Sequence, residues 1–391
     1  MGAVGLSSRH RAAIELMERF ATSTGVASAG PPRRYLWTDA FAVCNYLGLH
    51  VATGQSRYRR LALDLVTRVH DVLGRHRADD PRSGWISGLT EEEGRLHPTA
   101  CGLRIGKPRP ERRPEEPYDP AAEWDRDGQY FHYLTRWMHA LHRVWQVTRD
   151  EVYHGWAVEL ARVAAHRFSS GAVGNGRLYW KMSIDLSRPL VASSGVHDPL
   201  DGFVTVSGLA ADAPAPARTT AERLAPSLGS LARMCRARTW ITDDPLGAGS
   251  LLVDAYRSVR WEQGQPGLRE ILPSLLNDAL KSMEVVANSG VWRQSAERRL
   301  AFRELGFSIG IRAAQRLVGG YAAPGTALEH LELGPLQDEL QAFAPYEALA
   351  GEIERFWMDP GHRRAAGWSA HREISRVMLA TSLGPEGYLG P

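Results

Sequence analysis

The chain has few cysteines, few lysines and almost no stretches in which apolar and polar residues alternate. Its three cysteines, Cys44, Cys101 and Cys235, lie far apart. An odd number of widely spaced cysteines favours free thiols in a reducing compartment over a disulfide framework. The absence of any CxxC pair argues against a structural zinc site. Because alternation is the mark of a half-buried strand, its scarcity predicts a helical protein.

Long apolar runs and nucleotide-binding motifs are also missing. No run approaches the roughly 18 apolar residues of a membrane-spanning helix. The first 20 residues have an amphipathic pattern without the continuous apolar centre of a signal peptide. We therefore expect a cytoplasmic protein with no membrane partner. The absence of GxGxxG, Walker and HExxH-type patterns predicts that the chain uses neither a nucleotide cofactor nor a metal.

Charge is nearly balanced, with a net charge of +3. A nucleic-acid-binding protein would concentrate its basic residues on one face, so nucleic acid is not an expected partner. Lysine occurs only at Lys107, Lys181 and Lys281. Lys181 stands in a loop of aromatic, charged and hydroxyl residues, where a functional role and an ordinary surface position are equally good interpretations. With 43% hydrophobic residues, the chain has ample material for a large core.

Helical periodicity is abundant, and it is of two kinds. Segments such as Arg57–Arg75 place their apolar residues on one side, which is typical of a surface helix. Segments such as Trp37–Val51 and Gln129–Val147 are apolar nearly all round, which is typical of a helix buried between other elements. The repeating unit is therefore a buried inner helix, a short turn and an amphipathic outer helix.

Six inner and six outer segments can be assigned in this way. The inner segments are Trp37–Val51, Gln129–Val147, Leu200–Ala211, Pro245–Val259, Glu297–Leu317 and Trp368–Thr381. The outer segments are Ser8–Ala21, Arg57–Arg75, Glu151–Phe168, Thr219–Arg236, Gly267–Val286 and Leu328–Phe356. The pattern predicts an all-α fold, an (α/α)6 barrel of six inner and six outer helices. We expect it to form a single domain over residues 1–391.

Two long connections, residues 76–127 and 169–199, indicate where a site lies. In a ring of parallel inner helices, both loops share one end of the barrel. Long ordered loops on a rigid scaffold are common places for binding and catalysis. The inner segments begin at that end, and their first residues are rich in acids and aromatics. We predict that one cavity there is lined by Trp37, Asp39, Asp127, His197, Asp201 and Asp244.

The acids at these helix starts are the candidate catalytic groups. Glu123, Asp125 and Asp127 are too many for one helix cap, and Asp127 is the best candidate, followed by Asp125. Asp39 and Asp201, from neighbouring inner segments, are the expected partners. Burial and a neighbouring like charge raise the pKa of one carboxyl of such a pair, which can then act as a general acid. Helix capping and ion pairs with nearby arginines are the alternative roles.

Further residues at the same end are candidates for binding the substrate. They are Trp37, Glu123, Trp124, His132, Trp180, Lys181, Asp185, His197, Asp198, Asp244, Glu304, Trp368 and His371. For Asp198 and Asp244, which each precede a proline, N-capping explains the sequence equally well. For each tryptophan, a place in the core is the ordinary alternative. The polar stripe of His132, Arg136, His139 and Arg143 lines either the barrel interior or a solvated groove.

The helix starts LWTDAF and EWDRDGQYFHY, together with the six helix pairs, resemble the six-hairpin glycosidase-like superfamily. The resemblance covers nearly the whole chain. It implies an (α/α)6 barrel that acts on a small-molecule substrate, a saccharide or glycoside, at the long-loop end. It assigns no catalytic residue by motif.

Four functions fit these features. A glycoside hydrolase, our first prediction, needs one carboxylic acid to protonate the leaving oxygen and one carboxylate to activate water or attack carbon. An epimerase or isomerase, similar to the N-acylglucosamine 2-epimerase group, would use histidines such as His132, His197 and His371. A terpene-cyclase-like barrel would use Asp125 and Asp127 as a partial DxD motif in an apolar cavity. A non-catalytic binding barrel is the fourth.

Overall fold

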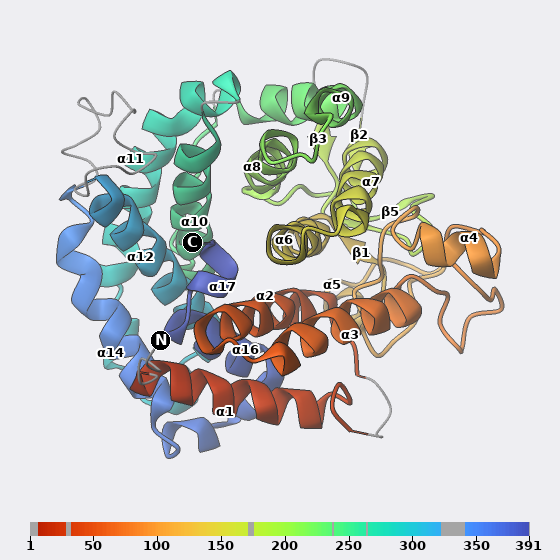
Figure 1. Cartoon of the computed structure of the whole chain (residues 1–391). Helices are drawn as coiled ribbons and strands as arrows, with labels where there is room; N and C mark the ends of the chain where they lie inside the picture. Colours follow the sequence, from red (N-terminus) through yellow and green to blue (C-terminus); the bar gives the residue numbers. More distant parts are fainter. Residues whose placement is uncertain are drawn as a thin grey trace. The chain divides into compact units, whose positions relative to one another are not determined.

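The structure is a computed structural model that describes residues 7–28, 33–170, 176–236, 238–262, 265–321 and 341–390. Within these residues the chain is mostly helical, with a few short strands (Figure 1). The chain divides into two compact units, which are described separately. Unit 1 consists of Met1–Phe20, Gly48–Gly54 and Arg236–Pro391, and unit 2 of Ala21–Leu47 and Gln55–Cys235.

Unit 2 contains helix pairs of the predicted kind. Its helices are α2 (Leu36–Thr53, whose end belongs to unit 1), α3 (Ser56–Leu73), α4 (Glu91–Leu96), α5 (Pro120–Asp125), α6 (Phe131–Thr148), α7 (Glu151–Arg167), α8 (Asp198–Ala211) and α9 (Ala217–Cys235). α6 packs against α3, α7 and α8, and α8 packs against α9. α8 is buried at every position except Ala211, whereas α3 buries one stripe. Full burial makes α8 an inner helix and the single stripe makes α3 an outer one.

Unit 1 repeats the same organisation. Its elements include α1 (Ser8–Ser23, whose end belongs to unit 2), α10 (Pro245–Trp261), α11 (Pro266–Asn288), α12 (Ala301–Tyr321), α14 (Glu347–Met358), α15 (Ala366–Ala370), α16 (Arg372–Leu383) and α17 (Glu386–Leu389). α10 packs against α11 and α12, and α12 packs against α14 and α16. Glycines allow the backbones of α10 and α12 to approach closely, because a Cβ on Gly249 would lie 2.1 Å from the Gly306 carbonyl oxygen.

The predicted helix pairs correspond to helices of the structure, with differences at their ends. The segment predicted from Glu297 begins as a 3-10 turn, Ala296–Arg298, and becomes α-helical only at Ala301. The last inner segment is divided into α15 and α16 at His371, whose ψ of 32° is not helical. In the outer segment Leu328–Phe356, residues 328–340 lie outside the described residues, and α14 starts at Glu347, after the 3-10 turn that contains Pro345.

The second long connection and the first two residues of the predicted inner segment Gln129–Val147 form strands that the sequence did not predict. β1 (Gln129–Tyr130), β4 (Lys181–Met182) and β5 (Pro189–Val191) form an antiparallel sheet, and β2 (Ser169–Ser170) pairs with β3 (Arg177–Leu178). Strands of two or three residues are too short to show alternation. The pairing of Tyr130 with Lys181 joins the second long loop to the start of α6.

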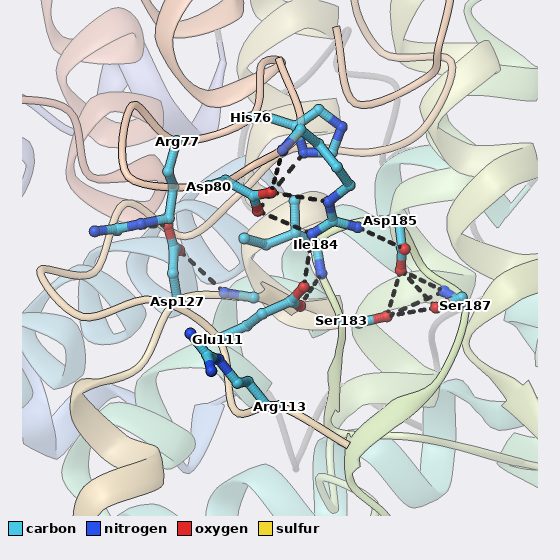
Figure 2. Close-up of polar contacts among 12 residues, drawn as sticks. His76, Arg77, Asp80, Glu111, Arg113, Asp127, Ser183, Ile184, Asp185 and Ser187 are labelled. Carbon is cyan, nitrogen blue, oxygen red and sulfur yellow. Dashed lines mark hydrogen bonds and ion pairs between the residues drawn. The ribbon is translucent and has the colours of Figure 1, made fainter. Parts of the chain in front are cut away.

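A charged network joins the first long loop to the second (Figure 2). Arg82 donates from Nη2 to Asp80 Oδ2 and Glu111 Oε1, both at 2.9 Å, and from Nη1 to Asp185 Oδ2 at 2.8 Å. Glu111 Oε2 also accepts the backbone N–H of Ile184 at 2.7 Å. Because three carboxylates from both loops share one guanidinium, the network holds the loops in a fixed register.

The structure also bears on the cysteines and on membrane-spanning helices. Cys44, Cys101 and Cys235 form no disulfide within the part of the chain that the structure describes. Among the residues that the structure describes, no helix combines the length and the apolar character that crossing a membrane requires.

Candidate active site

An aromatic cluster forms where α6 begins, and we use that name for Trp37, Tyr130, His132, Tyr133 and Trp180. The Tyr130 and His132 rings stack with their centroids 5.3 Å apart, and Tyr133 meets His132 edge-on at 4.9 Å. Trp180, next to β4, lies nearly parallel to His132 at 6.3 Å. Trp37 of α2 meets His132 edge-on at 6.1 Å. His132, Tyr133 and Trp180 are partly exposed, so part of the cluster is in contact with solvent.

Asp198, the first residue of α8, lies beside this cluster. Its Oδ1 is 3.7 Å from Nδ1 of His132, and its Oδ2 is buried without a hydrogen-bond partner among the described residues. The exposed fraction of the whole Asp198 residue is 6%. Burial, and then the negative charge of Asp201, raise the pKa of Asp198 to about 7. Near neutral pH, a large fraction of Asp198 is therefore still protonated.

Capping, the alternative role for both aspartates that precede a proline, applies to only one of them. The Asp244 Oδ2 accepts the backbone N–H of Gly247 at 3.0 Å and caps α10. In α8 the N-cap position is His197, and no side chain caps the helix. Asp198 is one residue further on, with its carboxyl directed at His132. The same Asp-Pro-Leu sequence thus provides the N-cap of α10, whereas in α8 its aspartate does not cap the helix.

Asp201 lies one turn along α8 from Asp198 and is fixed by two residues of α6. Its Oδ1 accepts from Arg136 Nη1 at 2.6 Å, and its Oδ2 accepts the Thr135 hydroxyl. The charge of Arg136 also acts on His132. Burial and then Arg136 lower the pKa of His132 to about 4, so its imidazole is neutral at pH 7. Asp198 therefore has an ion-paired carboxylate on one side and a neutral imidazole on the other.

Asp39, a predicted partner, is buried on α2. Its Oδ2 accepts the backbone N–H of Tyr35 at 3.1 Å, and its Oδ1 lies 3.4 Å from Nη1 of Arg34. Burial raises the pKa of Asp39 to about 7 even though the charge of Arg34 opposes this rise. With its oxygens directed at its own helix start, Asp39 has a local structural role.

Asp127, the favoured catalytic candidate, is fully buried and has no free lone pairs to offer a substrate. Its Oδ2 accepts from Arg104 at 2.6 Å and from Arg77 at 3.4 Å. Its Oδ1 accepts the backbone N–H groups of Gly106, Lys107 and Gly128 at 3.0, 3.3 and 3.1 Å. Figure 2 shows Arg77 next to this carboxylate. This geometry favours an anchor for the first long loop over the predicted catalytic role.

Glu123 and Lys181 form a second buried anchor. Lys181 Nζ donates to Glu123 Oε1, to the Glu123 carbonyl and to the Arg126 carbonyl, each at 2.8 Å. Arg112 Nε donates to the other Glu123 oxygen at 3.0 Å. Since an ammonium has three protons, Lys181 has none left for a substrate. The neighbouring Trp124 and Asp125 are exposed on α5.

The remaining predicted site residues have structural partners in their own units. Asp185 belongs to the Arg82 network, and hydrogen bonds from Ser187 and Ser183 outweigh burial and lower its pKa to about 2. In unit 1, Glu304 is held by Arg299 and the Trp357 indole at 2.6 and 2.8 Å. Trp368 stacks on Trp357 and His371 meets Phe302 edge-on, while Asp244 pairs with Arg303 at 2.7 Å.

The structure thus brings together Trp37, His132, Trp180, Asp198 and Asp201 in unit 2. Sequence reasoning missed Tyr130 and Tyr133, although EWDRDGQYFHY places a ring at each of the four residues 130–133. Arg136, His139 and Arg143 are buried, so the polar stripe of α6 is not a solvated groove. Among the residues described, no group of three or more metal-binding side chains could hold a metal ion.

Comparison with known proteins finds matches among solved structures alone, since no family model and no curated protein matches the chain. A GH76 α-mannanase of Bacteroides thetaiotaomicron matches with a TM-score of 0.56 and 9% identity, covering 100% of this chain and 99% of its own. The GH76A α-1,6-mannanase of Salegentibacter sp. HEL1_6 matches at 0.54 and 14% identity, covering 96% and 98%. A D-mannose isomerase matches at 0.50 and 11% identity, covering 97% and 99%.

These similarities show the fold of the chain, which is the (α/α)6 barrel. The fold prediction is confirmed. At 14% identity or less, similarity says nothing of activity. The activity has to be argued from the site.

Proposed function

We propose that the chain is a glycoside hydrolase in which Asp198 is the general acid and Asp201 is the second carboxylate. One observation carries this proposal. Two carboxyl groups on one turn of α8 have different surroundings, since Asp198 has a pKa raised to about 7 and Asp201 is ion-paired with Arg136. Two carboxyls whose environments separate their proton affinities are what acid-assisted glycoside cleavage requires.

In the proposed reaction, Asp198 donates its proton to the glycosidic oxygen as the bond from that oxygen to the anomeric carbon breaks. The Asp201 carboxylate faces the positive charge that develops on the sugar and either accepts a proton from the attacking water or attacks carbon itself. In the first case the hydroxyl of that water bonds to the anomeric carbon, Asp201 releases the proton to solvent and Asp198 takes one up from solvent. In the second case a water deprotonated by Asp198 hydrolyses the glycosyl–Asp201 ester, which frees Asp201 and restores the proton on Asp198. The rings of the aromatic cluster offer apolar faces for the sugar, and Arg136 keeps Asp201 in place.

The solved structures support a saccharide as substrate. They include a Salegentibacter α-1,6-mannanase in complex with α-1,6-mannotriose, described as an inactive variant in which two consecutive aspartates are replaced. In that protein, aspartates on this fold are needed for activity on a mannoside. We propose the same class of substrate for this chain. The two acids proposed for this chain, Asp198 and Asp201, are three residues apart, whereas the two aspartates replaced in the mannanase are consecutive.

A sugar isomerase or epimerase is the second candidate, and His132 is the observation that favours it. A histidine whose pKa is lowered to about 4 is neutral at pH 7 and can accept a proton from a carbon next to a carbonyl. Asp198, 3.7 Å away, would be the group that returns a proton. The solved D-mannose isomerase shares the fold.

One experiment separates the two candidates. The full chain is incubated in D2O with α-1,6-mannotriose and, separately, with mannose, and the products are followed by proton NMR. Hydrolysis consumes one water per bond and produces new reducing ends from the trisaccharide. Isomerisation leaves the number of reducing ends unchanged and places solvent deuterium next to the carbonyl carbon.

Two variants and one control identify the residues. We expect Asp198→Asn and Asp201→Asn to lose turnover by about 100-fold or more with melting temperatures that show folded protein. Asp125→Asn, which changes an exposed acid of α5, is expected to keep full turnover. Deuterium incorporation without new reducing ends would replace the hydrolase proposal with the isomerase one.

A further inference from the structure

We propose that Lys107 forms an anion-recognising subsite beside the aromatic cluster, so that the saccharide bound there carries a carboxylate or phosphate group. This inference rests on the proposed function and specifies its substrate class. It arises from the ammonium group of Lys107, which the fold holds in place. Asp125 is near enough for its charge to act on this ammonium, but no carboxylate of the described residues forms an ion pair with it.

The backbone of Lys107 is fixed on both sides. Its N–H donates to Asp127 Oδ1 at 3.3 Å, and its carbonyl accepts from Arg77 Nη1 at 2.7 Å. From this position the ammonium nitrogen lies 4.8 Å from the ring centroid of Trp124 and 5.6 Å from that of Tyr35. Cation–π contacts of this kind hold an ammonium without neutralising it.

Tyr35 connects Lys107 to the aromatic cluster. The hydroxyls of Tyr35 and Tyr133 are hydrogen-bonded at 2.6 Å, and Tyr133 meets His132 at 4.9 Å. Trp124, the other ring in contact with the Lys107 ammonium, lies 6.4 Å from Trp180 of the cluster and is 54% exposed. The ammonium of Lys107 is therefore at the solvent-facing edge of the aromatic cluster.

The charges around Lys107 favour an anion. Among the residues that the structure describes, no carboxylate lies within ion-pair distance of its ammonium. The buried acids nearby are already matched, Asp127 by Arg104 and Arg77 and Glu123 by Lys181 and Arg112. Residues 104–113 contain five basic side chains and one acidic one.

Lys181 contrasts with Lys107, because its ammonium cannot bind a further anion. Lys181 has all three protons bonded to oxygens of Glu123 and Arg126. Lys107 is half-buried, and burial, opposed by the charge of Asp125, lowers its pKa. A partly desolvated ammonium gains more from an anionic partner than an exposed one does. A compact ammonium binds a carboxylate or a phosphate ester of a sugar, whereas a neutral sugar offers it hydroxyls alone.

The test uses four matched probes and titration calorimetry on the full chain. They are methyl α-mannoside, its 6-phosphate, the corresponding uronate and the methyl ester of that uronate, which removes the charge. We expect the uronate or the phosphate to bind about tenfold or more tightly than the neutral probes, as for a charge-assisted hydrogen bond. The stronger of the two identifies the anion. The preference should shrink as salt is added.

Variants assign the preference to one side chain. Lys107→Gln should remove it, with affinity for the neutral probes unchanged, and Lys107→Arg should retain it. Lys281→Gln, the same change at an exposed lysine of α11, should have no effect. Equal binding of charged and neutral probes by the unaltered chain would overturn this inference and leave the hydrolase proposal standing, as would a preference that survives Lys107→Gln. Failure of every sugar to bind, together with no turnover of mannotriose, would overturn both.

Discussion

At the residue scale, the main difference between expectation and structure concerns which acid is free. Asp127 and Asp198 both stand at the starts of inner helices, and a sequence pattern cannot distinguish them. The distinction comes from Arg104 and Arg77, which precede Asp127 by 23 and 50 residues and reach its carboxylate only once the first long loop has folded. In the part of the chain that the structure describes, no arginine or lysine forms an ion pair with Asp198, and burial raises its pKa against the opposing charge of Arg136.

Replacement of Asp127 by Asn tests the anchoring role. The change keeps the shape but removes the negative charge between Arg104 and Arg77, which leaves buried cations without a counterion. We expect the free energy of unfolding in urea to fall by about 3–5 kcal/mol, with turnover per folded molecule retained. Asp125→Asn, at an exposed position, should change stability by less than about 0.5 kcal/mol. Normal melting combined with lost turnover would restore the catalytic role predicted from the sequence.

The raised pKa of Asp198 also predicts how stability depends on pH. In the unfolded chain an aspartate has a pKa of about 3.9, whereas in the folded chain that of Asp198 is about 7. Between these values the folded state keeps a proton that the unfolded state has lost. The contribution of Asp198 to stability is therefore complete below about pH 4 and decreases by about 1.4 kcal/mol per pH unit until about pH 7.

Asp198→Asn isolates this effect, because Asn resembles the protonated acid at every pH. We expect the variant to match the unaltered chain in urea unfolding at pH 4.5 and to be more stable at pH 8. Greater stability with lost turnover is typical of a functional site. If the variant were less stable than the unaltered chain by the same amount at both pH values, Asp198 would not carry the raised pKa.

At the scale of elements, helices were predictable and strands were not. The inner helix α8 is buried on all sides and the outer helix α3 on one. The spacing of apolar residues over their 14 and 18 residues predicts this difference. β1 and β4 are two residues each, and their pairing joins residues 51 and 53 positions apart, Tyr130 with Lys181 and Gln129 with Met182. Sequence reasoning therefore singled out the starts of α6 and α8, where the candidate site lies, but not the strand pairing that sets Trp180 against Tyr130.

Gly195, in the connection that leads into α8, tests whether this loop positions the general acid. A Cβ at this residue would lie 2.5 Å from the Cγ of Asp198, and because a carboxyl is the mobile end of a side chain, it would be displaced. We expect Gly195→Ala to lower kcat/KM by about tenfold or more with little change in melting temperature. Gly155→Ala on α7, where a Cβ meets nothing within 4 Å, should keep full activity and gain about 0.5–1 kcal/mol. Unchanged kinetics in Gly195→Ala would show that the loop leaves Asp198 where it is.

At the scale of the whole molecule, the prediction of a single domain remains to be tested. Two borders between the compact units fall inside helices, at Phe20 within α1 and at Leu47 within α2. Because a helix forms cooperatively, loss of one unit would disrupt helices that continue into the other. We expect one calorimetric transition with equal calorimetric and van't Hoff enthalpies. Two separable transitions would establish two domains instead.

If Asp198 protonates the leaving group, the activity lost by Asp198→Ala must depend on how much the leaving group needs that proton. The measurement compares kcat/KM for a 2,4-dinitrophenyl glycoside, whose leaving group needs no proton, with that for a glycoside of the same sugar whose leaving group is an alcohol. We expect the variant to lose about 100- to 10,000-fold on the alcohol glycoside and little on the dinitrophenyl one. An equal loss on both substrates, or full activity on the alcohol glycoside, would contradict the assignment of Asp198 as the general acid.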